Sequence, residues 1–213
     1  HAGDVEVARA ACGTLQSLAC AADNKVPLVR DGAHTAVMAA ARDHVGNVDV
    51  ARAACGALWN LACDSVDNKV PLLRAGAHTA VMAAVRAHAG DVEVARAACG
   101  VLRNLANADG NKVPMFRDGA HIAVMAAARA HTGDVKVARA ACIVLQNLAF
   151  AVDNRVPLFR DGAHIVVMAA ARAHAGDVEV ARAACGALLN LAAAAENKVP
   201  LARDGVHTAV MAV

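Results

Sequence analysis

The chain has 213 residues, of which 58% are hydrophobic and only 2% aromatic, and its formal net charge is +2. A net charge so close to zero gives no general case for nucleic-acid binding. No stretch of about 18 apolar residues is free of charge, so we expect no direct membrane insertion.

A unit of 43 or 44 residues repeats along the whole chain. Its marker, HxG(D/N)V, begins at five positions: His1, His44, His88, His131 and His174. A period of this size predicts stacked helical layers, each of which buries its apolar face against its neighbours. The chain opens on His1 rather than Met, which suggests a fragment or a processed chain.

Each unit is predicted to form three helices, as the segment 67–106 illustrates. Residues 67–76 (DNKVPLLRAG) predict a short first helix, with Asn68 as its N-cap, Pro71 in its first turn and Gly76 as a left-handed stop. Residues 77–90 predict an almost wholly apolar second helix ended by Gly90. A helix without a polar face is typically packed between others.

The third helix is predicted to start after Asp91, its N-cap. Apolar residues recur at three- and four-residue steps and predict one buried stripe: Val94, Ala98, Cys99, Leu102, Leu105 and Ala106. The opposite side is predicted to form a solvent-facing strip: Glu93, Arg96, Gly100 and Asn104.

Cysteine and histidine also form ladders. Five of the seven cysteines share one helical position: Cys12, Cys55, Cys99, Cys142 and Cys185. Neighbours are expected roughly 8–10 Å apart, one helix-packing layer, which exceeds the ~7 Å Cα limit for a disulfide. We therefore expect free, buried thiols in a reducing compartment, the cytoplasm or the nucleus.

Five histidines are predicted to open the second helices, and five precede the glycine that ends them. The first set is His34, His78, His121, His164 and His207, and the second begins the HxG marker. Capping and charge complementarity with the helix C-terminus are their expected roles. Members about 10 Å apart do not converge on one ion, so neither a metal site nor a cofactor is expected.

Catalytic motifs are missing from the sequence: it holds no GxxxxGK[ST], GxSxG or HExxH. Each Cys, His and Asp recurs in step with the repeat, whereas an active site needs an asymmetric convergence at one point. The pattern therefore predicts a binding module and not an enzyme.

The segment NKVPLLRAGA…VMAAVRAHAGDVEVARAACGVLRNLA resembles an armadillo repeat. The resemblance implies an all-α solenoid, a right-handed superhelix of three-helix units whose third helices line a concave groove. Because the family's repeat begins at the NK helix, it also implies one array over residues 1–213. Its parts would be a lone third helix (1–22), four complete repeats (23–65, 66–108, 109–151 and 152–194) and two helices of an incomplete repeat (195–213).

In this family an asparagine of the third helix hydrogen-bonds the backbone of an extended peptide. The matching positions are Asn60, Asn104, Asn147 and Asn190, with Ser17 in the first unit. A carboxamide offers both a donor and an acceptor to a peptide unit. Trp59, beside Asn60, is included among the predicted contacts. The alternative is that each asparagine caps or braces its neighbour's helix.

Importin-α proteins, which share this repeat, place tryptophan four residues before that asparagine. Here those positions are Gly13, Gly56, Gly100, Ile143 and Gly186, so recognition of a nuclear-localisation signal is not expected.

Arginines lie eight residues before each polar ladder position: Arg9, Arg52, Arg96, Arg139 and Arg182. Guanidinium groups bind carboxylate and phosphate bidentately, so the groove is predicted to prefer acidic or phosphorylated peptides. The alternative is a self-neutralised face, because an acid precedes four of them by three residues: Glu6, Asp49, Glu93 and Glu179. Lys136 replaces the acid in the fourth unit, so a basic region is predicted at Arg103, Lys136 and Arg139.

Two functions remain open. The first is a protein-interaction scaffold for extended peptides; the second is a purely structural or self-assembling part of a longer solenoid. Neither end carries a polar capping repeat, so head-to-tail self-association is expected. Nucleic acid is not an expected partner, since the strip lacks stacking aromatics.

Overall fold

A computed structural model of the chain describes residues 3–212, so His1 lies outside the described part. These residues form fifteen α-helices and no β-strand. The helices follow one another in sets of three, as the repeat predicts. In the described part, no helix is both long and apolar enough to cross a membrane.

The third helices are the longest: α1 (Val5–Leu18), α4 (Val48–Ala62), α7 (Val92–Ala106), α10 (Val135–Phe150) and α13 (Val178–Ala192). Each begins after an Asp or Asn whose side chain accepts a hydrogen bond from the first turn. Asp91, for example, accepts from the Val94 N–H at 2.9 Å. The predicted N-cap of the third helix is therefore confirmed, and it satisfies a donor that the helix leaves unpaired.

The first helices are short: α2 (Ala22–Arg30), α5 (Val66–Arg74), α8 (Asp109–Arg117), α11 (Val152–Arg160) and α14 (Ala195–Arg203). The N-cap of α5 is Ser65, so the prediction of Asn68 as N-cap was wrong. Asn68 lies inside the helix, and its amide nitrogen donates to the carbonyls of Lys25 (3.0 Å) and Leu61 (2.9 Å). Pro71 lies in the second turn and not the first, so α5 lacks one interior hydrogen bond.

The second helices are α3 (Ala33–Asp43), α6 (Ala77–Ala87), α9 (Ala120–Ala130), α12 (Ala163–Ala173) and α15 (Val206–Met211). Gly76 precedes α6 with φ of +89°, which confirms the predicted left-handed stop. Helix α6 ends at Ala87 with His88 as its C-cap, so Gly90 does not end it as predicted. The His88 N–H bonds the Ala84 carbonyl at 2.9 Å, which closes the last turn two residues earlier.

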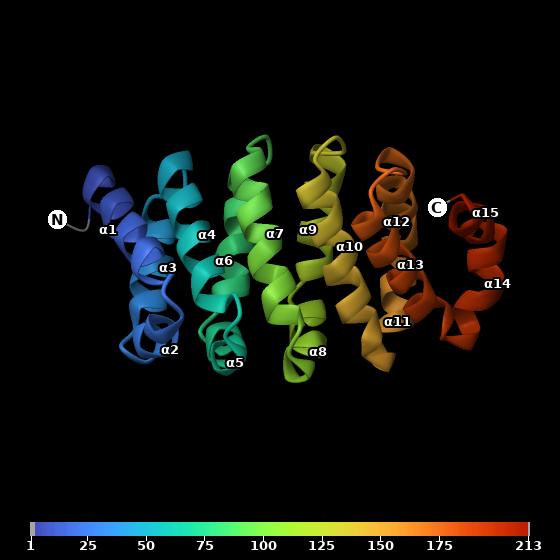
Figure 1. The fold of residues 1–213 in the computed structure, drawn as a ribbon, viewed down its shortest axis with the longest axis horizontal. Coiled ribbons are helices and arrows are strands. Elements are labelled where there is room, and N and C mark those ends of the chain that lie inside the picture. Colours follow the sequence, from blue (N-terminus) through green and yellow to red (C-terminus); the bar gives the residue numbers. More distant parts are fainter. Residues whose placement is uncertain (1–2, 213) are drawn as a thin grey trace. The chain divides into compact units, whose positions relative to one another are not determined.

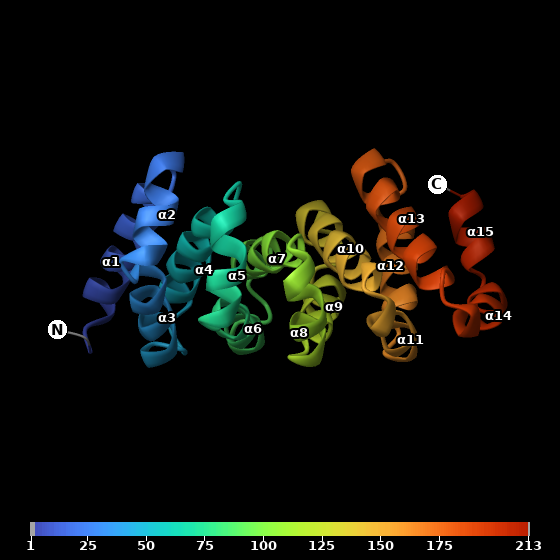
Figure 2. The same cartoon turned by 90° about the horizontal axis from the view of Figure 1, so that it is seen from below.

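The chain divides into two compact units, residues 1–111 and 112–213, with the division inside α8. In unit 1 the third helices α1, α4 and α7 pack side by side, with α3 and α6 against α4 and α7 (Figure 1). The first helices α2 and α5 also pack against each other (Figure 2). Unit 2 packs α10 against α13 in the same way. The single continuous array with the repeat limits given above stays a prediction.

Alanine and leucine of the third helices form the core of each unit. The predicted stripe of α7 is confirmed, because all six of its residues are buried. Leu102 and Leu105 are fully buried in unit 1, as are Leu145 and Leu148 in unit 2. Burial of such side chains supplies most of the stabilising free energy of a helical layer.

Candidate interaction surface

The asparagine ladder lies on the third helices, where two of its members brace a neighbour. The Asn60 amide nitrogen donates to the Gln16 carbonyl of α1 at 2.9 Å and to the Cys20 sulfur at 3.3 Å. Asn190 donates to the Gln146 carbonyl of α10 at 3.0 Å. Both are half-buried. Asn60 and Asn190 thus brace the neighbouring helix, which is the alternative role predicted for this ladder. Peptide contact stays a prediction.

Asn104 differs from these two. Only 7% of the residue is exposed, and its amide nitrogen is buried without a hydrogen-bond partner. Gly100 is buried as well, so the prediction that these two residues face solvent was wrong, because the preceding third helix packs over this part of the strip. The position whose carbonyl accepts from Asn60 and Asn190 is Gln16 and Gln146 in those two stacks, and it is Trp59 of α4 here. A buried amide donor without an acceptor costs free energy, about 1–3 kcal/mol. Asn147 is half-buried in unit 2.

Glycines of the strip receive side chains from the preceding third helix. A Cβ at Gly100 would lie 3.2 Å from Nε1 of Trp59, and one at Gly56 would lie 2.6 Å from Nε2 of Gln16. Gly186 receives Gln146 in the same way. Any larger residue at these positions would push the overlying side chain away. The glycine that recurs at this position of the third helices indicated these close contacts, but the sequence analysis did not predict them.

Trp59 therefore has two surfaces. One edge of the indole rests against Gly100 of α7, and 40% of the residue is exposed. Because Asn104 follows Gly100 by one helical turn, the indole and the unpaired amide belong to one face of α7. This is the part of the strip where an apolar ring and a free donor occur together.

The arginine ladder is largely paired with acids. Arg9 binds Glu6 at 2.7 Å, Arg182 binds Glu179 at 2.9 Å, and Arg96 binds Glu93. These three arginines are thus neutralised by acids of their own helix, as the alternative prediction stated. They are mostly solvent-exposed, and such pairs contribute only about 0–1 kcal/mol each.

Arg52 also reaches the next repeat. It binds Asp91, the N-cap of α7, through two nitrogens at 2.5 and 3.2 Å, and Asp49 of its own helix at 3.2 Å. The hydrogen bond with Arg52 holds the pKa of Asp91 below its ordinary value. This bidentate pair joins two successive third helices of unit 1.

The predicted basic region needs a correction. Arg139 lacks the acid three residues before it, as expected, but it binds Glu179 of the next repeat at 2.8 Å, because α10 and α13 pack side by side. Lys136 is exposed and forms no ion pair within the described residues. Arg103 is half-buried in the last turn of α7, in unit 1. Its predicted grouping with Lys136 and Arg139 of unit 2 stays a prediction.

Histidines that open the second helices join successive repeats in unit 2. His121 bonds Asp161 at 2.9 Å and stacks on Phe116, while His164 bonds Asp204 at 3.0 Å and stacks on Phe159. Burial lowers the pKa of both imidazoles, and the acids partly offset this. The N-caps of these helices are glycines without a side-chain cap hydrogen bond, so the predicted capping was wrong and these histidines bridge repeats instead.

The histidines that follow the second helices are C-caps, as predicted, and they too bridge repeats. The ring Nε2 of His88 bonds the Val45 carbonyl at 2.9 Å, and that of His174 bonds the Thr132 carbonyl at 2.9 Å. Within residues 3–212, no three His, Cys, Asp or Glu side chains converge to hold a metal ion.

The cysteine ladder is free and mostly buried, as predicted. Burial raises the pKa of Cys55, Cys99 and Cys142 to about 12. Thiols with such values stay protonated near neutral pH and are poor nucleophiles. They act as small apolar residues of the core.

A second asparagine ladder went unrecognised in the sequence. Its members precede the Lys or Arg of each first helix, and four of them are buried: Asn68, Asn111, Asn154 and Asn197. Each amide nitrogen donates to two carbonyls, one in the preceding first helix and one at the end of the preceding third helix. The invariant position of this residue in the unit was the available signal.

The family comparison agrees with this architecture. The model described as LRRK2 ARM repeat matches residues 1–115. A search of curated proteins gives no significant match. The predictions of an armadillo repeat and of an all-α solenoid fold are confirmed. By the extent of this match, the chain belongs to the LRRK2 ARM repeat family.

Proposed function

We propose that this chain is a protein-interaction scaffold whose third helices bind an extended peptide segment of a partner. Armadillo repeats generally mediate protein interactions, and the third helices here carry amide, guanidinium and indole groups at their surface. The proposed contacts are the asparagines Asn60, Asn104, Asn147 and Asn190 with their neighbouring arginines and Trp59.

The unpaired amide nitrogen of Asn104 carries the proposal. This nitrogen is buried, so a peptide carbonyl that bonds it must displace the side chains that cover it, and it would then supply the acceptor that the chain itself lacks. The exposed part of the Trp59 indole would pack on the adjoining side chain of the peptide, since aromatic rings contribute much of the binding free energy in such contacts. Asn60 and Asn190 use their nitrogens internally, and their amide oxygens accept no hydrogen bond from a described residue.

The proposed peptide is acidic or phosphorylated. The arginine pairs of the strip are exposed and individually weak, so a carboxylate or phosphate can replace one acid partner at little cost. Phosphate binds guanidinium bidentately and more strongly than a single carboxylate oxygen does. Lys136 adds a cation that has no acid partner among the described residues.

Titration of the intact chain with fluorescent peptide libraries tests this proposal. We expect acidic and phosphorylated libraries to bind more tightly than a basic one, with an affinity that falls as salt rises. Preference for the basic library would contradict the charge assignment. A lack of binding to all libraries would contradict the peptide-binding proposal itself.

Two substitutions locate the contact. Asn104→Ala and Asn147→Ala should each weaken peptide binding at least about tenfold, because each removes a proposed amide hydrogen bond to the peptide. The exposed Lys198 of α14 provides a control, and Lys198→Ala should leave the affinity unchanged. Unchanged affinity in both asparagine variants would remove these residues from the site.

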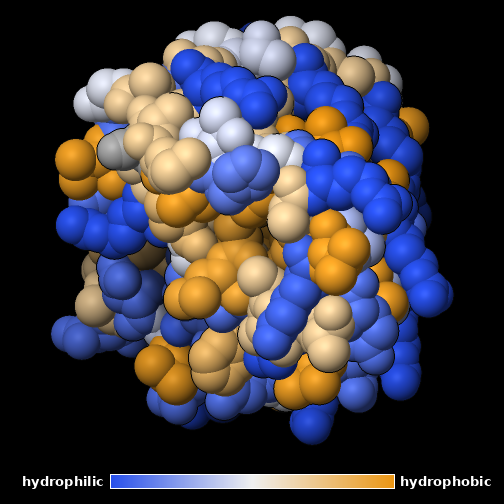
Figure 3. Space-filling model, turned by 90° about the vertical axis from the view of Figure 1, so that its right-hand side faces the viewer, coloured by the Kyte–Doolittle hydropathy of each residue, from blue (hydrophilic) through white to orange (hydrophobic). Residues whose placement is uncertain are grey.

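A structural role is the second candidate, and exposed apolar side chains favour it. In unit 2, Leu189, Val199 and Met211 are 71%, 67% and 77% exposed. Figure 3 shows apolar residues among charged ones at this end of unit 2. A further helical layer packed there would bury them. Sedimentation velocity at increasing concentration tests head-to-tail association, which a constant monomeric value would contradict. The cytoplasmic or nuclear location stays a prediction.

A further inference from the structure

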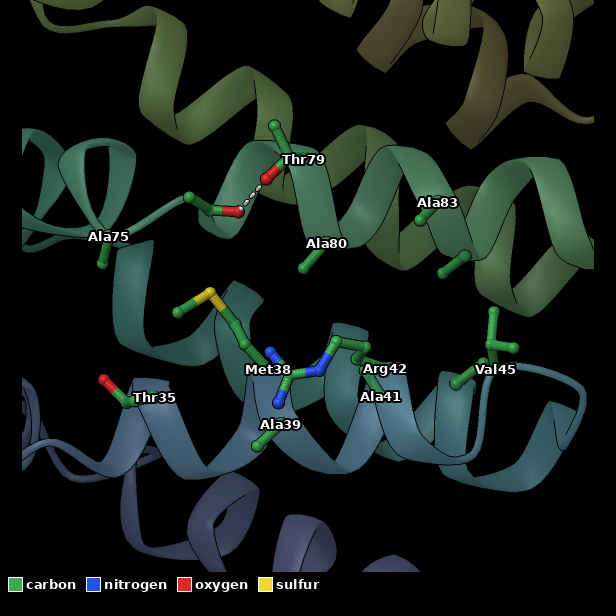
Figure 4. A pocket seen from close by; sticks show the side chains of 13 residues that line it. Thr35, Met38, Ala39, Ala41, Arg42, Val45, Ala75, Thr79, Ala80 and Ala83 are labelled. Atoms are coloured by element: carbon green, nitrogen blue, oxygen red, sulfur yellow. Dashed lines mark hydrogen bonds between the residues drawn. The ribbon is translucent and has the colours of Figure 1, made fainter.

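An apolar groove lies between the second helices α3 and α6 of unit 1. It has a volume of about 520 Å³ and is lined mainly by alanine together with Met38, Arg42 and Val45. Figure 4 shows these side chains between the two helices, with Thr35 and Thr79 at one end and Val45 at the other. The groove is separate from the third-helix strip, since no residue of that strip lines it.

The groove is open because small residues face each other across it. Ala39 of α3 and Ala80 and Ala83 of α6 line its walls, where leucine would fill the space. Side chains beside unfilled space lose the dispersion contacts that a neighbour would supply. A second surface with matching apolar side chains would recover those contacts.

One basic group lies at this groove. Arg42 uses Nε for a 3.3 Å pair with the adjoining Asp43, and its side chain is 76% exposed. Its two terminal nitrogens bond no described residue, and in Figure 4 the guanidinium lies beside Met38 at the groove. The Thr79 hydroxyl already donates to the Gly76 carbonyl at 2.6 Å.

The same arrangement recurs in unit 2. A groove of about 260 Å³ lies between α9 and α12, lined by Arg129, Thr132, Ile165 and several alanines. Arg129 occupies the position in α9 that Arg42 occupies in α3. A basic group beside an alanine-walled groove is therefore a property of the repeat and not of one accidental gap.

We propose that the α3–α6 groove binds an amphipathic helix of a partner protein, with aliphatic side chains in the groove and an acidic residue on Arg42. An extended peptide would leave its N–H and C=O groups against alanine walls that offer few partners. A helix satisfies its own backbone and needs only an apolar face. The flanking helices have eleven residues each, about 16 Å, which matches three turns of a guest helix.

A lone fatty acid is the competing occupant. It would also place an alkyl chain on alanine and a carboxylate on Arg42. Small ligands, however, usually have most of their surface enclosed, whereas this groove has a side that is open to solvent. A guest helix covers that side with its own polar face, so the observations favour the helix.

Binding of synthetic helices to the intact chain tests the groove. The probe is a fluorescent three-turn peptide with leucine at i, i+3 and i+7 and one glutamate beside this stripe. Ala80→Leu fills the groove and should weaken binding at least about tenfold. Ala36 is exposed on α3 and lines no part of the groove, so Ala36→Leu is the matched control. Equal affinity of the two variants would overturn the proposal.

A charge exchange tests the role of Arg42. Arg42→Glu should weaken the glutamate peptide about tenfold and restore binding of a peptide with lysine in its place. Arg30 ends α2 and pairs with the adjoining Asp31 at 3.5 Å, so Arg30→Glu is a control of matched chemistry. The proposal is contradicted if Arg30→Glu has the same effect, or if dodecanoate binds and the helical peptide does not. Circular dichroism checks that each variant keeps its helices.

Discussion

Two neighbouring interfaces of unit 1 use the same ladder in different ways. Between α1 and α4, the Gln16 side chain lies over Gly56, and Asn60 donates to the Gln16 carbonyl. Between α4 and α7, the Trp59 ring lies over Gly100, and the amide nitrogen of Asn104 has no acceptor.

The residue packed before the asparagine differs between the two interfaces, and so does the hydrogen bonding of the asparagine. At the Gln16 interface, the Asn60 amide bonds the preceding helix and stabilises the layer. At the Trp59 interface, Asn104 is buried with an unmade hydrogen bond, which destabilises the layer. Asn68 and Asn111 bridge these interfaces in the same way in both cases, so the contrast is confined to the third-helix strip.

The largest loss of stability is expected at Asn68 and Asn111, which form the same two hydrogen bonds in both interfaces. Asn68→Ala and Asn111→Ala should each lower the free energy of unfolding by about 2–3 kcal/mol, because two hydrogen bonds to backbone carbonyls are lost at a buried site. Urea denaturation measures this loss. Asn24 is the exposed member of the same ladder, with one bond to the Leu18 carbonyl, and Asn24→Ala should cost less than about 1 kcal/mol. Equal losses in all three variants would show that burial is irrelevant.

Replacement of the third-helix asparagine by leucine should change the free energy of unfolding in opposite directions at the two interfaces. Leucine has the same branching and the same number of side-chain heavy atoms as asparagine and a better helix propensity, and both factors apply equally at the two positions. Asn60→Leu should lower the free energy of unfolding by about 1 kcal/mol, since the Gln16 bond is lost. Asn104→Leu should raise it by about 1 kcal/mol, since an unpaired buried donor is removed.

Peptide affinity separates this result from a purely structural explanation. Asn104→Leu should bind acidic peptides more weakly than the unmodified chain although it is more stable. A variant that lost both stability and affinity would show that Asn104 makes an internal bond and that the two interfaces are alike.

The sequence predicted the helices well because their signals are local and repeated five times. The cap at Asp91, the left-handed Gly76 and the buried stripe of α7 each follow from spacing along one chain segment. Asn68 was assigned wrongly because a cap and a bridging amide share the same residue type near a helix start. Only the position of the preceding repeat distinguishes them.

The strip was harder to predict because its contacts join different repeats. The acids three residues before the arginines were visible in the sequence, and they form ion pairs with those arginines, as the alternative stated. The Arg139–Glu179 and Arg52–Asp91 pairs were not foreseen, since their partners lie about 40 positions further along. The unpaired amide of Asn104 lies where α4 packs against α7, and spacing along the chain does not predict which hydrogen bonds form there.

The smallest predicted effect is a loss of stability in acid, which depends on the histidines that open the second helices. His164 faces Asp204, but at the position that would face His34 the chain has Ala75. Burial lowers the pKa of both imidazoles, so below about pH 6.5 the unfolded chain takes up protons before the folded one. Stability is therefore complete above that value and falls as the solution is acidified.

Changing the acid should change the size of this loss in opposite directions. Asp204→Asn removes a group that raises the pKa of His164, so the folded pKa falls further and acidification should destabilise the chain more. Ala75→Asp should do the reverse for His34 in unit 1. The measurement is the difference in melting temperature between pH 7.5 and pH 5.5, with Asp153→Asn as an exposed control. If all three variants lose the same amount, the acids opposite these histidines do not set the acid sensitivity of the repeats.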